Sequence, residues 1–426
     1  MSGSTDDRSV GVDGPLLITS VDAAGRERSR LIPRARVDSV LRTGVHASIS
    51  SVALFTPTDD PVDALGRDAV IGDLLLAPDA ERIARLGERG PAWTPADVRE
   101  IDGTPFAGCG RRAVRRQQTR LAERGLSARI GFEIEFTLDG GEAVDPSPAH
   151  TGPAYGQHPI LQNEAFATEL LTEFDAAGVP ALQLHAEHGH GQFEVALDAR
   201  DPLDACDDDV LARLVIDRVA LRHGLRADFS PIPRVGAASN GMHIHLSLAR
   251  DGAPLFSPDS DDAPGSAGKA AIAGILAELP ALTALLAGSV PSYERLRPGR
   301  WSGATVCWGP GNREAAVRYV ASTAGGSARG ANIEIKPGDA SANPYYAVAA
   351  LLAAAENGIA RGAVPPAPVL VSPTRLSEGE RAAVGIRPLP SSLTEALAEL
   401  DRSVVLRAAL GDALIDLYLA VRTPHG

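Results

Sequence analysis

Short apolar segments separated by turn residues dominate the first hundred positions of the chain. Three of them are residues 16–21 (LLITSV), 46–55 (HASISSVALF) and 73–79 (DLLLAPD), and Asp, Gly and Pro residues lie between them. This pattern predicts the strands of a small β-rich domain. The next segment, 89–110, is rich in Pro and Gly and predicts a domain boundary near residue 108.

Longer segments with a helical period alternate with strand-like segments after that boundary. Five of them predict helices: 163–178 and 207–224 have the apolar 3.6 period with a closing glycine, whereas 266–288 and 342–362 are Ala- and Leu-rich and nearly apolar all round, which predicts that they are buried. The five segments cover residues 111–125, 163–178, 207–224, 266–288 and 342–362. This mixed order favours an α+β fold over a parallel, doubly wound sheet. We expect a leader at 1–14 that is disordered, an N-terminal domain at 15–107 and a larger catalytic domain at 108–426.

The charge balance excludes some classes of function. The chain has 41 basic and 54 acidic residues and a formal net charge of −13, which argues against nucleic-acid binding. The most apolar stretch, 270–290, contains Glu278 and Pro280, and we expect these two residues to break it, so no membrane helix is predicted. The polar leader does not resemble a secretory signal. The sequence therefore predicts a cytoplasmic protein.

Cysteine and lysine are both scarce. Cys109, Cys206 and Cys307 are far apart and fit neither a zinc site nor a disulfide framework, so we expect reduced, partly buried thiols. Among 41 basic residues only Lys269 and Lys336 are lysines. A lysine in this chain therefore indicates a place where a compact ammonium group is needed.

Four predicted strands carry polar side chains on one face. In GFEIEF, successive side chains alternate between the two faces, so Glu133 and Glu135 lie opposite three apolar residues. The same count applies to GQFEVAL, NGMHIHLS and NIEIKP. Their polar faces carry Gln192, Glu194, His243, His245, Ser247, Glu334 and Lys336. If these strands line one sheet, several carboxylates and a histidine converge on one site.

Such a site needs positive charge. Oxygen-rich ligand sets suit Mg²⁺ or Mn²⁺ better than structural zinc. Glu187 precedes Glu194 by seven residues with glycines between them, so both carboxylates can face one centre. His185, His188 and His190 also lie there, and we expect them to be solvated or hydrogen-bonded rather than zinc ligands. Arginines that can bind anionic oxygens follow at Arg313, Arg318 and Arg329.

The ordered series GFEIEF, EHGHGQFE, NGMHIHLS, SYERLRPG, NREAAVR and IEIKPGDASANPYY resembles the glutamine synthetase family of ATP-dependent carboxylate-amine ligases. The resemblance covers nearly the whole chain. It implies a small β-grasp-like N-terminal domain, followed by a catalytic domain in which helices surround a curved antiparallel sheet.

The resemblance also implies roles for individual residues. One divalent ion would be held by Glu135, Glu187 and Glu194, and another by Glu133, His243 and Glu334. Nucleotide contacts are implied for His245 and Ser247. Phosphate-binding and catalytic arginines are implied at Arg313 and Arg318, with Arg329 a further phosphate contact. Arg295 would bind the carboxylate of the amino acid.

Three positions depart from the ammonia-using members of the family. Where those members have a Glu that binds ammonium and takes its proton, this chain has Trp301. Lys336 replaces an Arg, and Ala238-Ser239 replaces an Asn-Gly pair that contacts glutamate, which places Ser239 at the substrate. The Trp and the Lys are similar to the branch that joins glutamate to organic amines. Which residue acts as the catalytic base in place of that Glu is left open. One alternative is Asp59 or Asp60 of a neighbouring subunit.

The sequence therefore predicts an ATP- and Mg²⁺- or Mn²⁺-dependent ligase that joins glutamate, or a similar acid, to an organic amine through an acyl phosphate. The alternatives are an ammonia-using glutamine synthetase with a modified flap, a non-catalytic sensor or scaffold, and a metal-dependent amidohydrolase. The resemblance further implies a homo-oligomeric ring, hexamer or dodecamer, with active sites between subunits. The sequence stops at DLYLAVRTPHG, where ammonia-using bacterial members continue into a helical tail that reaches the facing ring, so the double ring is left open.

Overall fold

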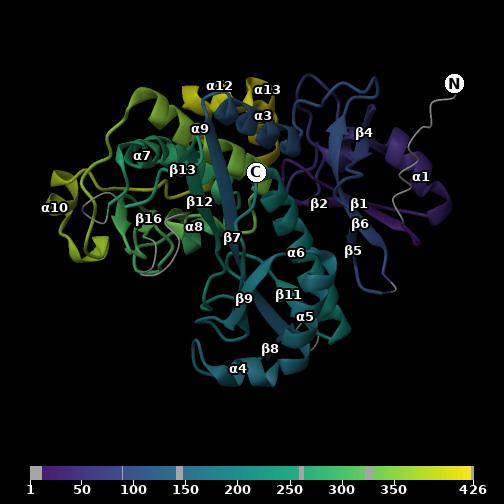
Figure 1. Ribbon diagram of the computed structural model, residues 1–426, viewed down its shortest axis with the longest axis horizontal. Helices are drawn as coiled ribbons and strands as arrows, with labels where there is room; N and C mark the ends of the chain where they lie inside the picture. The colour runs from purple at the N-terminus through teal and green to yellow at the C-terminus, as the bar shows by residue number, and fades with distance from the viewer. Residues whose placement is uncertain (1–11, 89, 141–146, 259–262, 322–329, 424–426) are drawn as a thin grey trace.

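The computed structural model describes residues 12–88, 90–140, 147–258, 263–321 and 330–423. It is an α+β protein, as predicted, with a smaller sheet near the N-terminus and a larger sheet surrounded by helices (Figure 1). Of the expected leader, residues 1–11 lie outside the described part, whereas Val12 is 4% exposed and belongs to the hydrophobic core.

The smaller sheet has six strands in the order β2-β1-β6-β4-β3, with β5 paired to β6. Strand β1 runs parallel to β6, and the other pairs are antiparallel. The strands are β1 (Leu16–Val21), β2 (Glu27–Ile32), β3 (Val45–Ser48), β4 (Asp73–Pro78), β5 (Ala84–Arg85) and β6 (Ala92–Arg99), and the helices are α1 (Arg34–Thr43) and α2 (Ile49–Val52).

One prediction for this region is wrong. The segment 46–55 is not one strand, because β3 ends at Ser48 and α2 begins at Ile49. The Pro- and Gly-rich segment 89–110 also contains a strand that was not predicted, β6, which lies in the middle of the sheet. Pro95 is tolerated there because it stands where β6 changes from pairing with β1 to pairing with β4, and its carbonyl accepts from Asp79 N.

The larger sheet has ten strands, seven of which follow the order β15-β16-β17-β12-β7-β10-β9. Along this path only the β15–β16 pair is parallel. The strands are β7 (Leu126–Gly140), β8 (Ser147–Pro148), β9 (Ala181–Ala186), β10 (Gln192–Leu197), β11 (Arg226–Asp228), β12 (Met242–Arg250), β13 (Ala253–Pro254), β15 (Trp308–Pro310), β16 (Val317–Val320) and β17 (Asn332–Ile335). A separate pair joins β14 (Thr305–Val306) to β18 (Arg387–Pro388).

Helices cover this sheet and fill the space beside the smaller one (Figure 1). They are α3 (Gly110–Ala122), α4 (Gln157–Gln162), α5 (Glu164–Ala177), α6 (Pro202–Arg222), α7 (Ser266–Leu286), α8 (Ser292–Arg295), α9 (Pro344–Arg361), η2 (Pro373–Arg375), α10 (Glu378–Ala383), α11 (Leu393–Arg402), α12 (Val404–Leu410) and α13 (Asp412–Arg422). All five predicted helical segments are present, and a left-handed glycine, Gly178 or Gly362, directly caps α5 and α9.

Helix α7 corrects the reading of the apolar stretch, because Glu278 and Pro280 do not interrupt it. By length and composition it could cross a membrane, but 78% of its most apolar window is buried inside the protein. It packs on α9 through glycines. A Cβ on Gly274 would come within 2.7 Å of Gly358 Cα, so the two helix backbones approach closely. This contact is typical of a core helix pair.

The turn between β1 and β2 fixes the N-terminal sheet to the catalytic part. Gly25 has a φ of 72°, and a Cβ there would lie 2.8 Å from the carbonyl oxygen of Ser341. Beside it, the buried Arg422 donates to the carbonyls of Gly288 and Ser341, and Asn343 Nδ2 donates to Asp22 O at 2.9 Å. Only glycine fits this close approach.

Candidate active site

The strand register of the larger sheet brings the predicted polar faces together. Glu194 on β10 lies opposite Glu135 on β7, and Glu133 on β7 lies opposite His243 on β12. His245 pairs in turn with Glu334 on β17. Because these pairs occupy neighbouring strands on one face, the side chains form a single charged row. The row borders a cavity of about 890 Å³.

Most of the predicted site residues line this cavity. They are Glu133, Glu135, Glu187, Glu194, Ser239, His243, Arg295, Trp301, Arg313, Glu334 and Lys336. Glu187 reaches it because the chain turns directly after β9. At the centre, His243 Nδ1 lies 3.2 Å from Glu133 Oε2 and 3.4 Å from Glu334 Oε1.

The carboxylates and histidines of the row change one another's pKa values. Burial, and then repulsion by Glu133, Glu135 and Glu187, raises the pKa of Glu194 to about 10. Burial also disfavours the charged form of Glu133, yet hydrogen bonds with His243 and His245 outweigh it and hold its pKa below the usual range. A carboxyl that stays protonated at neutral pH within a cluster of carboxylates indicates a lack of positive charge at that point.

Three groups of donor atoms are close enough to hold a cation. They are Glu133 with His245 and Glu334, Glu133 with Glu194 and His243, and His185 with Glu187 and Glu194, each within 4.8 Å. The donors are carboxylate oxygens and imidazole nitrogens, which suit Mg²⁺ or Mn²⁺. The groups differ from the two trios that the resemblance implied: they include His185 and His245 and omit Glu135.

Comparison with known proteins agrees with this geometry. Residues 107–424 match the family model described as "Glutamine synthetase, catalytic domain". The chain belongs to the glutamine synthetase family. Enzymes of the glutamine synthetase family use ATP and divalent metal ions. The protein is accordingly a ligase of that family, as the sequence predicted.

Relatives cover almost the whole chain. A gamma-glutamylpolyamine synthetase of Streptomyces coelicolor is 40% identical over 420 residues, which are 97% of this chain and 89% of the relative. A glutamine synthetase of Thermus thermophilus is 30% identical over 416 residues, 96% of this chain and 91% of the relative.

Solved structures of the glutamine synthetase family also superpose on the chain. A crystal structure described as a novel glutamine synthase homolog has a TM-score of 0.83 and 33% identity, and covers 99% of this chain and 95% of its own. A GmaS complex with ADP has a TM-score of 0.84 and 27% identity, with 97% and 93% covered.

Four cationic residues surround the charged row. Lys336 is 3% exposed, and its Nζ lies 2.8 Å from Glu334 Oε1. Arg318 Nη1 lies 2.8 Å from the other oxygen of Glu334. Burial raises the pKa of Glu334, but the charge of Lys336, followed by those of the two histidines, lowers it to about 2. Glu334 is thus a permanent anion between two cations.

Arg295 and Arg313 occupy different parts of the cavity wall. Arg295 is 3% exposed and donates to the carbonyls of Lys336 and Pro337, with its Nη2 3.5 Å from His243 Nε2. Arg313 lines the cavity. The predicted nucleotide contact Arg329 lies outside the described residues.

The two other predicted nucleotide contacts lie on β12 beyond the residues that line the cavity. His245 is hydrogen-bonded to Asn332 Oδ1 at 2.9 Å, and its other nitrogen lies 3.2 Å from Glu133. Ser247 Oγ donates to Ala331 O at 3.4 Å. Their contact with a nucleotide stays a prediction.

Sequence reasoning gave several cavity residues no role in the site. His185, which we expected to be solvated or hydrogen-bonded, has its Nε2 3.1 Å from Glu187 Oε1, and it shares a strand face with Gln183, which also lines the cavity. The alternation along β9 could have revealed this pair. Tyr155 also lines the cavity, and its hydrogen bond with Glu187 helps to keep the pKa of Glu187 low against the effect of burial. No pattern in the loop around Tyr155 indicates this position.

The cavity rim holds two aromatic residues in an unusual backbone conformation. Tyr155 and Trp301 have backbone φ values of 57° and 54°, which residues other than glycine rarely adopt. Trp301 contacts the ring of His188 at 5.8 Å, and Tyr155 stacks on His185 at 6.2 Å. Backbone N–H groups of Gly299 and Trp301 donate to Glu314, which holds the turn. Left-handed conformations at a cavity are typical of functional positions.

Proposed function

We propose that this protein joins the γ-carboxylate of glutamate to an organic amine in an ATP-dependent reaction. The observation that carries the proposal is the aromatic rim around Glu187. Trp301 stands where ammonia-using relatives are expected to have a carboxylate, and its indole N–H can only donate. Trp301, His188, Tyr155 and His185 instead line the same cavity as Glu187, with Trp301 against His188 and Tyr155 against His185.

This arrangement suits an alkylammonium ion better than ammonium. Glu187 attracts the charge of the amine, because hydrogen bonds keep the pKa of Glu187 low. The rings of Trp301 and Tyr155 offer apolar surface to the carbon chain and cation–π attraction to the charged group. Free ammonium has no carbon chain to bury and gains nothing from that surface. The name of the Streptomyces relative, a gamma-glutamylpolyamine synthetase, supports the same substrate class.

The acid substrate would bind near Arg295. Its guanidinium is buried among Lys336 O, Pro337 O and His243. A buried arginine beside an open cavity attracts a carboxylate strongly, because the low local dielectric increases the interaction. Ser239 lines the same cavity, and its carbonyl accepts from Gln192 Nε2 at 2.9 Å. We assign Arg295 and Ser239 to the acid substrate.

The chemistry follows from the charges. The γ-phosphoryl group of ATP passes to an oxygen of the substrate carboxylate, which yields ADP and an acyl phosphate. The neutral amine then attacks the acyl carbon, the C–O bond to phosphate breaks, and one amine proton leaves to form the amide. Arg313, Arg318 and Lys336 offset the charge on the transferred phosphoryl oxygens.

A divalent cation fits the carboxylate row. The predicted ligands are Glu133, Glu135, Glu187, Glu194, His243 and Glu334, and the structure adds His185 and His245 as candidates. When bound, Mg²⁺ or Mn²⁺ would supply Lewis-acid stabilisation of phosphate charge. A cation there would also relieve the repulsion that raises the pKa of Glu194.

The test is a comparison of nucleophiles. We would measure kcat/KM from phosphate release with ATP, Mg²⁺ and glutamate, using ammonium, ethylamine, putrescine and spermidine in turn. The wild type should prefer an organic amine, and Trp301→Glu should shift the preference toward ammonium. Trp301→Phe is the matched control, because it keeps an aromatic face and should keep the amine preference. If ammonium is the best nucleophile of the wild type, the proposal is wrong.

We further propose a cytoplasmic, homo-oligomeric ring with active sites between subunits. Within this chain, Asp59 is bound by Arg28 at 2.7 Å and belongs to the N-terminal domain. A base from Asp59 or Asp60 would therefore come from a second copy. Size-exclusion chromatography with light scattering tests the assembly, and fluorescence microscopy of a tagged chain tests the location.

A further inference from the structure

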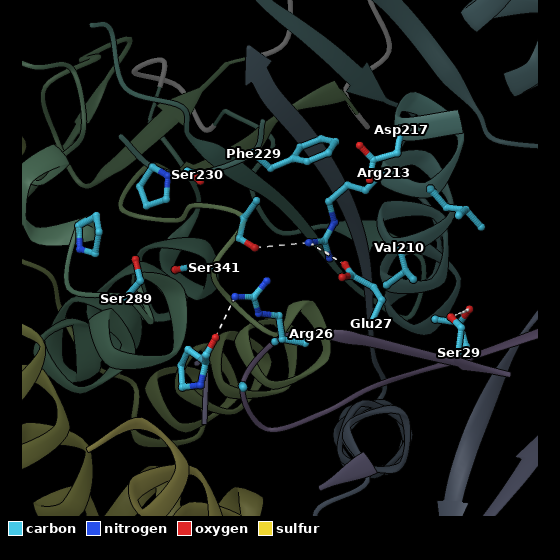
Figure 2. Close-up of a pocket in the computed structure, with 18 of the residues that line it drawn as sticks. Arg26, Glu27, Ser29, Val210, Arg213, Asp217, Phe229, Ser230, Ser289 and Ser341 are labelled. Carbon is cyan, nitrogen blue, oxygen red and sulfur yellow. Dashed lines mark hydrogen bonds and ion pairs between the residues drawn. The ribbon is translucent and has the colours of Figure 1, made fainter. Parts of the chain in front are cut away.

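A second cavity, of about 470 Å³, lies between the N-terminal sheet and the catalytic part of the chain. We call it the interdomain pocket. Its walls come from the β1–β2 turn with β2, from α6, from residues 229–231 and from the loops before α8 and α9 (Figure 2). It shares no lining residue with the active-site cavity. Its volume is in the range of small-molecule sites.

Two arginines of the pocket, Arg26 and Arg422, have no acidic partner in the described part of the chain. Arg422 is buried, and its two Nη groups donate to the carbonyls of Gly288 and Ser341. Arg26 Nη2 donates to the carbonyl of Pro57 at 2.9 Å, and its guanidinium forms no ion pair with any residue in the described part of the chain. A neutral carbonyl does not cancel a positive charge. Arg26 is therefore free to bind an anionic group.

The pocket also contains one carboxylate without a basic partner. Asp217 on α6 forms neither a hydrogen bond nor an ion pair within the described ranges. Desolvation raises the pKa of Asp217 to about 6, the negative charge of Glu27 adds to the rise, and the positive charge of Arg213 opposes it without forming an ion pair. A cationic group beside Asp217 would reverse this effect.

Arg213 and Glu27, two further charged residues of the pocket, are paired with each other. Arg213 lies 3.0 Å from Glu27 and 2.9 Å from Asp209, so its charge is neutralised. In Figure 2 this Arg213–Glu27 pair lies between Arg26 and Asp217. A ligand in the pocket thus meets one free positive charge and one free negative charge at separate places.

The pocket wall is partly apolar. Val210 is buried, and the ring of Phe229 is half-buried. Such a wall suits a short carbon chain, since burying methylene groups contributes about 0.8 kcal/mol each. Both Nη groups of Arg422 are already bound to carbonyls and offer no free fork to a dianion, and the lining has no second unpaired carboxylate for a diamine within the described residues.

We propose that the interdomain pocket binds a small zwitterion, whose carboxylate contacts Arg26, whose ammonium group contacts Asp217, and whose carbon chain lies against Phe229. The proposal concerns a site apart from the active-site cavity and does not depend on the proposed ligase reaction.

The test is isothermal titration calorimetry of the full chain without ATP. The probe is 5-aminopentanoate, with pentanoate and pentylamine as analogues that each lack one charge. The wild type should bind the probe, and each analogue should bind at least about tenfold more weakly. Arg26→Gln and Asp217→Asn should each weaken probe binding at least about tenfold, or about 1.4 kcal/mol.

Two controls locate the site. Arg34→Gln and Asp38→Asn change an exposed ion pair on α1 and should leave binding unchanged. Arg295→Gln alters the active-site cavity and should also leave it unchanged. The proposal is overturned if the probe does not bind, if an analogue binds as well as the probe, if neither pocket variant weakens binding, or if only Arg295→Gln does.

Discussion

Replacing Lys336 with methionine tests the charge arrangement of the active site. The side chain is buried, and its Nζ lies 2.8 Å from Glu334, itself 1% exposed. Methionine has a similar volume, so packing is largely kept while the ammonium group is lost. Glu334 would keep Arg318, at 2.8 Å, as its remaining partner.

The magnitude follows from this geometry. Breaking a buried ion pair completely costs about 3 to 5 kcal/mol, because a charge is left without compensation. Since Arg318 still neutralises Glu334, we expect a smaller loss of stability. The lost point charge toward the transferred phosphoryl group should lower kcat/KM by at least about tenfold, or about 1.4 kcal/mol of transition-state stabilisation.

The assay is phosphate release from ATP at subsaturating glutamate with the best amine. Lys269→Met is the matched control, because it removes the only other lysine, which lies half-buried on α7. Lys336→Arg should recover part of the activity, since it restores the charge in a different geometry. A wild-type kcat/KM in a correctly folded Lys336→Met variant would refute the assignment of Lys336 to the reaction.

Three further predictions concern the metal, the domain contact and pH. Glu194→Ala, or chelation of divalent ions in the wild type, should abolish ATP turnover with unchanged circular dichroism; full activity in both cases would contradict the metal assignment. Arg422→Ala should lower the unfolding free energy, measured by chemical denaturation, by about 2 to 4 kcal/mol, because the carbonyls of Gly288 and Ser341 lose their donor. The control Arg402→Ala changes an exposed side chain and should alter the unfolding free energy little. Because the pKa of Asp217 in the folded protein, about 6, exceeds the ordinary value, its contribution to stability is present at low pH and is lost as pH rises from about 4 to 6. Asp217→Asn should therefore be more stable than the wild type at pH 7 and show a smaller decline across that range in thermal melts.

Strand alternation made most of the site predictable. Counting every second residue placed Glu133 with Glu135 and His243 with His245, and the observed register joins these same faces. The period of two is a local property of the backbone, so it can be read from sequence. Which strands pair is not local, and neither the pattern nor the resemblance predicted it.

The rest depends on contacts that no local pattern encodes. Strand β6 was missed because Pro95 and nearby glycines are usual in loops, whereas its pairing with two strands is decided by tertiary structure. Tyr155 reaches Glu187 from a loop whose path is set by packing. The grouping of His185 and His245 with the carboxylates depends on rotamers and distances within about 5 Å, which spacing along a chain does not give.

Gly25 packs closely against Ser341 and Arg422, and this contact also limits how the enzyme can move. A hinge needs a few residues that absorb large changes in φ and ψ without breaking contacts. The β1–β2 turn cannot serve as one, because any rotation there would drive its backbone into the neighbouring carbonyl, 2.8 Å from the nearest possible Cβ. We therefore expect the N-terminal sheet and the catalytic part to move together at this contact.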